Sequence, residues 1–465
     1  MITADCPSLE ERGGGEAIMD WSKLLTNKRL GMEDYHAQKA DDRTEFQRDY
    51  DRLIFSAPFR RLQNKTQVFP LPGSVFVHNR LTHSLEVACV GRSLGDSVSK
   101  KLKKKYADSV PFIDEIGSIV SAACLAHDLG NPPFGHSGEN AISTYFSEGK
   151  GLALKKSDTF ESGVEQELWT DFTRFEGNAN AFRLLTHQFN GRREGGFVLT
   201  YSTLASMVKY PYLSNFADAK KSKFGFFHSE KEVFQKIADD LGVIPHPENP
   251  NRFARYPLVY LLEAADDVCY QVMDIEDAHK LKIVNSEQTL RLLMAFFPQH
   301  RLQRIEDTMK IVTDVNEQIA YLRSSVIGIL VEECAQVFVN HETEILHGTF
   351  VGSLIDRLPE TSALAYKQCA EVAVKKIYCA TEVLDIELAG YKIILTLLDE
   401  LTQAVLAPHK AYSKQLLRRI PSQYETDSLD IYGKIQSILD YISGMTDVYA
   451  LDLYRKITGM SLPSL

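Results

Sequence analysis

Apolar residues recur at helical spacing along most of the chain after about residue 40. In the segments 85–94, 116–123 and 393–401 they fall three or four positions apart, which places them on one face of an α-helix. Alternation typical of strands is sparse, and residues 66–69, followed by prolines and a glycine, predict one short strand and turn. The pattern therefore predicts an all-α fold, mainly helical with a small β-hairpin.

Polar stretches interrupt the helical pattern, and no repeat of fixed period is visible. We expect loops at 147–166, 190–196, 214–230 and 242–257, the last of which holds four prolines. These loops are predicted to be insertions in one helical body.

The length of 465 residues is near or beyond what one hydrophobic core usually supports. We expect an N-terminal extension over 1–18, a core with loop insertions over 19–282, and a helical C-terminal region over 283–465 packed on that core. The extension carries a run of three glycines and no apolar period, so it is predicted to be tag-like or disordered, and whether it is native stays open.

Composition is that of a globular protein, with 44% hydrophobic and 25% charged residues. The balance of 52 basic against 62 acidic residues argues against a protein built to coat nucleic acid. No apolar run reaches the roughly 18 residues that a membrane span needs. Seven cysteines without a CxxC pair predict neither a disulfide framework nor a structural zinc site, and with no signal-peptide layout we expect a cytoplasmic protein.

His127-Asp128 is the one His-Asp pair in the sequence, and it follows an apolar segment, 116–126, that is predicted to be a buried helix. Pro132 and Pro133 must end that helix, because proline lacks a donor and disfavours the α conformation before it. A buried carboxylate without a partner costs several kcal/mol, and one metal ion would satisfy both side chains. The alternative is a hydrogen-bonded core histidine beside a capping aspartate.

Two further polar features lie within apolar helical patterns. His83 lies on the apolar face of a predicted helix that continues past Leu94. Asp266, Tyr270 and Asp274 are spaced four residues apart and therefore share one helix face. Such a stripe is costly in a core and suits the wall of a site. The alternatives are a structural histidine and an interhelical hydrogen-bond network.

The order of His83, His127-Asp128 and Asp266 resembles the HD superfamily of metal-dependent phosphohydrolases. More narrowly, the chain resembles the bacterial deoxyguanosinetriphosphate triphosphohydrolase (dGTPase) family, with matching blocks at 59–63, 65–69, 79–83, 127–139, 175–179, 209–211, 263–267 and 443–447. The resemblance implies an HD-domain helical body and a helical C-terminal region that contributes to an oligomer and to the substrate pocket.

The resemblance also implies a site for one divalent metal ion made of His83, His127, Asp128 and Asp266. Asp266 is chosen over Asp267 because it begins the one-face stripe and is the position that the family motif uses. Two imidazoles and two carboxylates suit Mn²⁺ or Mg²⁺, and Fe²⁺, Zn²⁺ or Ni²⁺ are also compatible.

The activity implied by the resemblance is hydrolysis of a deoxynucleoside triphosphate (dNTP) at the α-phosphorus, with release of deoxynucleoside and intact inorganic triphosphate. The leaving group is the 5′-alkoxide of the sugar, which needs a proton from a general acid. We expect His136, nine residues after His127, to be that acid and Glu139 to orient and tune it. The alternative is that His136 and Glu139 cap the next helix.

A triphosphate carries about four negative charges, so cationic and donor groups must line its pocket. By resemblance, the substrate-binding residues are Gln67, Arg80, Asn131, Asn178, Lys209, Tyr210, Tyr270 and Asp274. Arg80, Lys209 and Tyr210 are expected at the phosphates. Tyr270 would exclude a 2′-hydroxyl, and Asp274 would accept a hydrogen bond from the 3′-hydroxyl. Each of these polar residues could instead be an ordinary surface group.

Five lysines between 100 and 105 form a basic run after the His83 helix. A solvated helix end that complements the helix dipole explains them, and an anionic effector or single-stranded DNA is the alternative. The resemblance implies a homo-oligomer, a tetramer or hexamer, modulated by a dNTP or single-stranded DNA, with no membrane partner.

Two other functions stay open. An HD-type nucleotide phosphodiesterase or 5′-nucleotidase would leave inorganic phosphate or a nucleoside monophosphate. A catalytically silent HD scaffold would bind nucleotides without turnover. The preferred base, the physiological metal and the oligomer number are not given by the sequence.

Overall fold

The computed structural model describes residues 17–34, 42–69, 77–106, 109–155, 164–218, 222–428 and 430–460. In this part of the chain the structure is predominantly helical, with one two-stranded antiparallel sheet, so the predicted fold class is confirmed. Most of the expected N-terminal extension, residues 1–16, lies outside the described residues. Among the described helices none is long and apolar enough to cross a membrane.

The helices of the first part of the chain are α1 (Trp21–Leu24), α2 (Glu45–Ile54), α3 (Ala57–Arg61), α4 (Arg80–Tyr106), α5 (Ile116–Ala126), α6 (His136–Ser147), α7 (Gln166–Thr173), α8 (Gly177–Thr186), α9 (Tyr201–Met207), α10 (Lys231–Leu241) and α11 (Val259–Lys280). Those of the second part are α12 (Ser286–Met294), α13 (Gln299–Ile311), α14 (Val315–Asn340), α15 (Glu342–His347), α16 (Glu360–Val372), α17 (Thr381–Leu406), α18 (Ala411–Leu417), α19 (Ile431–Ser443) and α20 (Asp447–Ile457). Short 3₁₀ turns and one π-helical turn, η8 (Ala373–Ile377), join some of them.

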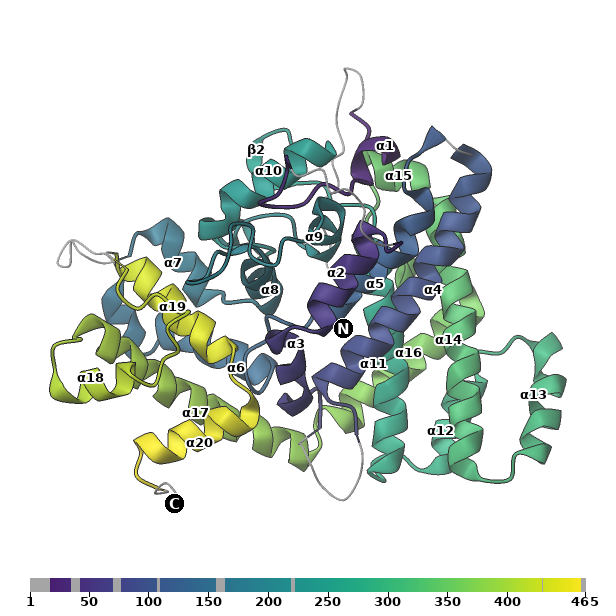
Figure 1. Cartoon of the computed structure of the whole chain (residues 1–465). Coiled ribbons are helices and arrows are strands. Elements are labelled where there is room, and N and C mark those ends of the chain that lie inside the picture. The colour runs from purple at the N-terminus through teal and green to yellow at the C-terminus, as the bar shows by residue number, and fades with distance from the viewer. Residues whose placement is uncertain are drawn as a thin grey trace.

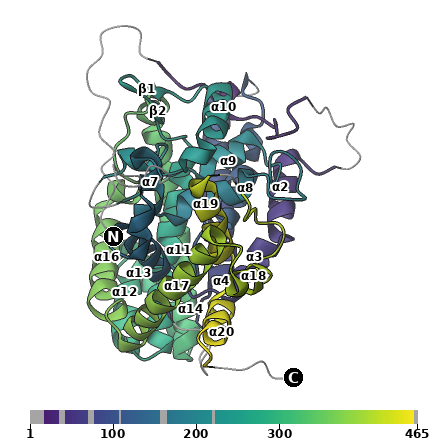
Figure 2. The same ribbon diagram turned by 90° about the vertical axis from the view of Figure 1, so that its left-hand side faces the viewer.

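The long helix α4 packs against α5, α11 and α14, and these helices run side by side in Figure 1. On the other side of the molecule α17 packs against α6, α19 and α20. Figure 2 shows α17, α19 and α20 from the front. The buried apolar side chains fall into two clusters that follow this division. The start of α6 therefore lies where the C-terminal helices meet the rest of the chain.

Helix α5 forms because its sequence is almost wholly apolar and all but one of its residues are buried. Ser121, the buried hydroxyl-bearing residue of this helix, donates to the carbonyl oxygen of Ala88 in α4 at 3.0 Å. The helix ends at Ala126, immediately before the His-Asp pair, as the sequence predicts. The pair is thereby held at the end of a rigid buried element.

Three of the five lysines in the basic run at the end of α4 form ion pairs within the protein. Lys101 pairs with Glu332 at 2.8 Å and Lys103 with Asp114 at 2.6 Å. Lys105 pairs with Glu342 at 2.7 Å. These contacts favour a structural role for the run over a binding surface for single-stranded DNA or another anion.

The β-structure lies elsewhere than the sequence predicts. Thr66 makes a single bridge to Asn79, and residues 67–69 are irregular, so the strand expected at 66–69 is wrong. The sheet consists of β1 (Pro245–His246) and β2 (Asn249–Phe253), inside the segment expected to be a loop. Prolines are tolerated in strands this short, where a missing backbone donor interrupts few ladder hydrogen bonds.

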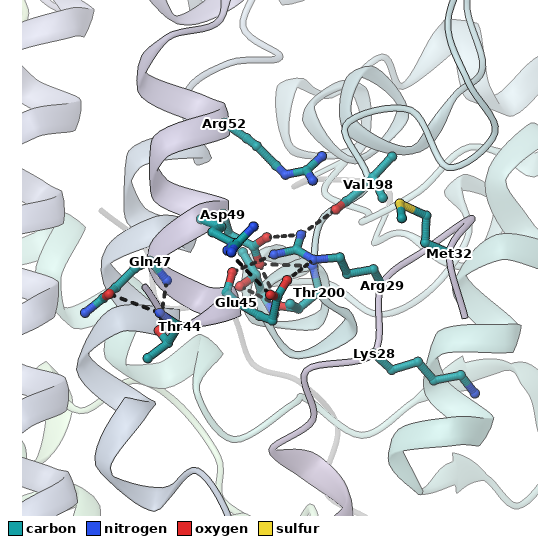
Figure 3. Close-up of polar contacts among 12 residues, drawn as sticks. Lys28, Arg29, Met32, Thr44, Glu45, Gln47, Asp49, Arg52, Val198 and Thr200 are labelled. Atoms are coloured by element: carbon teal, nitrogen blue, oxygen red, sulfur yellow. Dashed lines mark hydrogen bonds and ion pairs between the residues drawn. The ribbon is translucent and has the colours of Figure 1, made fainter. Parts of the chain in front are cut away.

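A buried arginine joins the N-terminal segment to the helical core (Figure 3). Arg29 Nη1 donates to Asp49 Oδ1 and to the carbonyl oxygen of Val198, both at 2.6 Å. Its Nε donates to Glu45 Oε2 at 2.6 Å. The second oxygen of Asp49 accepts from the Thr200 hydroxyl at 2.6 Å, so every group of this network has a partner.

We predict that Arg29→Met lowers the free energy of unfolding by about 3–5 kcal/mol, because it leaves the fully buried carboxylate of Asp49 without its cation. Urea denaturation followed by circular dichroism measures the change. As a control, Lys310→Met removes an exposed pair with Asp307 and leaves the midpoint unchanged. Equal midpoints for the two variants would contradict a stabilising role for Arg29.

Candidate active site

Two histidines and an aspartate converge where α4 meets the end of α5. His83 projects from the first turns of α4, and His127-Asp128 directly follow α5. One ligand atom from each of His83, His127 and Asp128 lies within 4.8 Å of the others. All three side chains are buried. Three potential ligand atoms are thus close enough to share one cation.

Asp266 on α11 reaches the same corner. Its Oδ1 lies 3.2 Å from His83 Nε2 and 3.4 Å from His127 Nε2, while its Oδ2 accepts from Lys209 Nζ at 2.9 Å. Asp266 is outside the tighter group of three, so it touches the two imidazoles rather than Asp128. Its neighbour Asp267 borders a cavity beside this corner. Burial, followed by the charges of Glu263 and Asp266, raises the pKa of Asp267 well above its usual value.

The hydrogen bonds of His127 and Asp128 leave an atom of each free for a metal. His127 Nδ1 lies 2.6 Å from the carbonyl oxygen of Cys124, which can only accept, so Nδ1 carries the proton. Within the part of the chain that the structure describes, His127 Nε2 and Asp128 Oδ2 are buried without a hydrogen-bond partner. Buried polar atoms are normally paired, and a ligating histidine normally donates its other ring nitrogen in this way. The residues present therefore fit a divalent cation.

The electrostatics of the corner also favour a cation. Burial alone would lower the pKa of His127, but the carboxylates of Asp128 and Asp266 outweigh it and raise that pKa. Burial would raise the pKa of Asp128, but Arg80, then His127 and His83, lower it. The carboxylates thus stay ionised although they are buried, and they supply the negative charge that a metal needs.

A cavity of about 300 Å³ opens beside this corner. Arg80 Nη1 lies 3.0 Å from Asp128 Oδ1, and Asn131 donates to the same oxygen at 2.5 Å. The sequence-predicted residues that line the cavity are Gln67, Arg80, His127, Asp128, Asn131, His136, Glu139, Asn178, Lys209, Tyr210, Asp266 and Tyr270.

Two predicted residues lie behind the cavity wall rather than in it. His83 is buried beneath the corner, with its ring centroid 5.4 Å from that of His127. Asp274 lies one helical turn beyond Tyr270 and accepts from the Tyr378 hydroxyl at 2.8 Å. Burial raises the pKa of Asp274 to about 7, although the Tyr378 hydrogen bond opposes that shift.

His136, the first residue of α6, lies in the cavity with its side chain 73% exposed, while Glu139 behind it is buried. His136 Nδ1 lies 2.8 Å from Glu139 Oε2, and Glu139 Oε1 accepts from the backbone N–H of Gly177 at 2.7 Å. The hydrogen bond and charge of Glu139 raise the pKa of His136. Glu139 therefore binds the imidazole and α8 instead of capping its own helix.

The carboxylate of Glu139 is held ionised. Burial would raise its pKa, but the charge of Lys223, followed by His136 and the Gly177 N–H, lowers it to about 2. Gly177 permits this close approach, because a Cβ there would lie 2.7 Å from Glu139 Oε1 and 2.4 Å from Asn131 Oδ1.

Lys223 and Glu176 also line the cavity, and the sequence did not single them out as site residues. They form an ion pair with each other. Glu176 lies in the block 175–179, so its motif was visible, whereas Lys223 lies in a polar loop without a spacing that marks it. Glu176 also accepts from the Asn178 side chain at 2.8 Å.

A second cavity of about 470 Å³ adjoins the first and shares Lys209, Tyr210 and Asp267 with it. Arg255 and Glu263 also line this second cavity, and Arg255 donates to Glu263 at 2.7 Å. The space beside the metal corner is therefore larger than the first cavity alone.

Comparison with family models agrees with this geometry. A model described as an HD domain matches residues 80–194, which include His83, His127-Asp128 and His136. A second, described as a phosphohydrolase-associated domain, matches residues 357–456. The HD domain implies a divalent metal, and the group of His83, His127 and Asp128 can hold one. The protein is a metal-dependent HD phosphohydrolase.

Curated relatives narrow the class. A deoxyguanosinetriphosphate triphosphohydrolase-like protein of Synechocystis sp. is 37% identical over 464 residues, which cover 96% of this chain and 100% of the relative. One of Pseudomonas aeruginosa is 38% identical over 463 residues, with the same coverage. A deoxyguanosinetriphosphate triphosphohydrolase of Yersinia enterocolitica is 31% identical, covering 89% of this chain and 93% of the relative. The chain belongs to the deoxyguanosinetriphosphate triphosphohydrolase-like family, which confirms the resemblance.

We predict that Mn²⁺ raises the thermal unfolding temperature of the protein and that Asp128→Asn abolishes the increase. A ligand that binds only the folded state stabilises it by about 2.7 kcal/mol at a hundredfold excess over its Kd. Differential scanning fluorimetry with and without Mn²⁺ measures this. The control is His341→Ala, which removes a half-buried histidine paired with Glu344 away from the site and keeps the increase. An unchanged increase in Asp128→Asn would remove Asp128 from the metal site.

Proposed function

We propose that the protein is a dNTP triphosphohydrolase that converts dGTP, and other dNTPs it accepts, to deoxynucleoside and inorganic triphosphate. The observation that carries the proposal is one cavity that holds a metal-binding corner, the His136–Glu139 pair and three cationic side chains. The names of the relatives supply the substrate class.

A metal held by His83, His127, Asp128 and Asp266 would neutralise phosphate charge and activate a water molecule. The carboxylate of Asp266 is shared between the two imidazoles and Lys209, so it orients all three. The proton on His127 Nδ1 fixes the ring orientation and directs Nε2 into the corner.

The three cations Arg80, Lys209 and Lys223 would bind the triphosphate. Each pairs with a carboxylate of the site, so positive charge is kept in the cavity without a phosphate. Arg80 Nε is buried and has no hydrogen-bond partner in the described ranges, so it can donate. Tyr210 adds a phenol whose pKa burial raises, so it stays a neutral donor. Asn131 and Asn178 supply further donors.

His136 would protonate the departing 5′-oxygen. Its raised pKa favours the protonated imidazole, and the exposed ring projects into the cavity. Glu139 cannot compete for the proton, because its pKa is held at about 2. In this pair His136 is the proton donor, and the Glu139 carboxylate is a fixed acceptor that orients the imidazole.

The sugar would lie against Tyr270. Gln67 is part of the cavity lining, and its Oε1 is buried without a hydrogen-bond partner among the described residues, so it can accept from a sugar hydroxyl. Asp274 would reach the sugar only with its Oδ1, because Tyr378 donates to Oδ2. The homo-oligomer and the dNTP or single-stranded DNA effector stay predictions.

The test is incubation of the purified protein with each of the four dNTPs and GTP, in Mn²⁺ or Mg²⁺, with products followed by ³¹P NMR. We predict inorganic triphosphate from at least dGTP and little turnover of GTP. His136→Ala should slow the reaction by about 10²–10⁴-fold. Inorganic phosphate or a nucleoside monophosphate as product would indicate the phosphodiesterase or nucleotidase, and binding without turnover would indicate a scaffold.

The pH dependence tests the proton donor. A general acid acts only when protonated, so kcat should fall as pH rises through the raised pKa of His136. Glu139→Gln removes the main cause of that raised pKa, so we predict that the alkaline decline moves to lower pH. Glu148→Gln, at the far end of α6, is the matched control and leaves the profile unchanged. A decline that stays in place in Glu139→Gln would contradict the coupling.

A further inference from the structure

The turn between α19 and α20 reaches back to two loops of the active site. Asp447, the first residue of α20, accepts from the backbone N–H of Phe134 at 2.9 Å with Oδ1. Its Oδ2 accepts from the backbone N–H of Thr66 at 2.8 Å. The side chain is buried, so both hydrogen bonds are shielded from water. One carboxylate therefore joins two segments far apart in sequence.

Lys65 makes a second bridge among the same three segments. Its Nζ donates to the carbonyl oxygen of Asn131 at 2.6 Å and to that of Ser443 at 2.7 Å. The Lys65 side chain is buried, and the backbone carbonyl oxygen of Lys65 accepts from the Arg80 N–H at 3.2 Å. The loop at 65–67, the loop at 131–136 and the turn at 443–447 thus form a closed arrangement.

The two loops carry side chains that the proposed reaction uses. Gln67 follows Thr66 directly, and His136 lies two residues beyond Phe134. Phe134 has a φ of +63°, in the left-handed region that residues with a side chain seldom adopt. Such a conformation persists only where surrounding contacts hold it.

Helix α17 supports the same loop from a second side. Ser137 donates to the carbonyl oxygen of Glu387 at 2.6 Å. Gly390 lets the Phe134 side chain approach, because a Cβ on that glycine would lie 2.5 Å from Phe134 Cβ. The region matched by the phosphohydrolase-associated domain therefore contacts the His136 loop through both α17 and α20.

We propose that Asp447 is a positioning residue that holds His136 and Gln67 in place for the reaction. It does not line the cavity, so it acts through the two loops and not on the substrate. A carboxylate suits this role because each oxygen accepts one N–H, whereas an asparagine has one acceptor oxygen and would turn an N–H against an N–H. The inference rests on the proposed role of His136.

The test compares Asp447→Asn with Asp452→Asn, a variant on the same helix whose carboxylate makes an exposed pair with Lys456. We expect Asp447→Asn to lower kcat by about 10²-fold, the usual effect of misplacing a reacting group by about 1 Å. Bound Mn²⁺ stays at the wild-type level, and Asp452→Asn keeps wild-type kcat.

A double-mutant cycle separates positioning from general destabilisation. If Asp447 acts through His136, Asp447→Asn in the His136→Ala background lowers kcat by less than about threefold. We also expect Asp447→Asn to raise KM by displacing Gln67, and this rise disappears in the Gln67→Ala background. A full 10²-fold loss of kcat in the His136→Ala background would overturn the proposal.

Hydrogen exchange tests the contacts without any substrate. Peptides over 62–69 and 131–136 should exchange faster in Asp447→Asn and at the wild-type rate in Asp452→Asn, measured by mass spectrometry. Lys65→Met, which removes the second bridge, should raise exchange in the same peptides. It is the test variant if Asp447→Asn fails to fold. Unchanged exchange in the folded variant would overturn the proposal. Absence of triphosphate release by the wild type, with these exchange differences present, would overturn the proposed function alone.

Discussion

The structure depends on keeping two carboxylates ionised inside an apolar helical core. Asp128 and Asp266 lie where α4, α11 and the end of α5 meet, and burial alone would favour their neutral forms. Arg80, Lys209 and two imidazoles outweigh that cost. A cluster so balanced keeps its geometry in the absence of substrate and exposes charge of both signs to the cavity. Metal binding and phosphate binding thus follow from one arrangement of charges.

Much of the site could be predicted because its residues occur in the sequence at characteristic spacings. The apolar segment 116–126 predicted a buried helix that ends at His127-Asp128, and the structure has both. The stripe of Asp266, Tyr270 and Asp274 predicted one helix face, but Asp274 points to Tyr378 behind the cavity wall. Periodicity shows which residues share a helix face, but it does not show which other element packs against each of them.

The features that could not be predicted depend on backbone groups and on loops. The hairpin of β1 and β2 lies in a proline-rich stretch whose composition is typical of a loop. Lys223 enters the cavity from a loop without periodic pattern. Asp447 binds two backbone N–H groups, which every residue except proline carries, so no residue type at 66 or 134 marks them as its partners. Only the folded chain shows such pairings.

The contacts of Asp447 and Ser443 have a consequence for the order of events during synthesis. Lys65, Thr66 and Phe134 leave the ribosome long before residues 443–447, which bind them. Until that segment is synthesised, the backbone N–H groups of Thr66 and Phe134 and the side chain of Lys65 lack partners that they have in the folded protein. A chain that stops before Ser443 can therefore hold the complete HD motif and still lack the contacts that tie together the two loops beside Gln67 and His136.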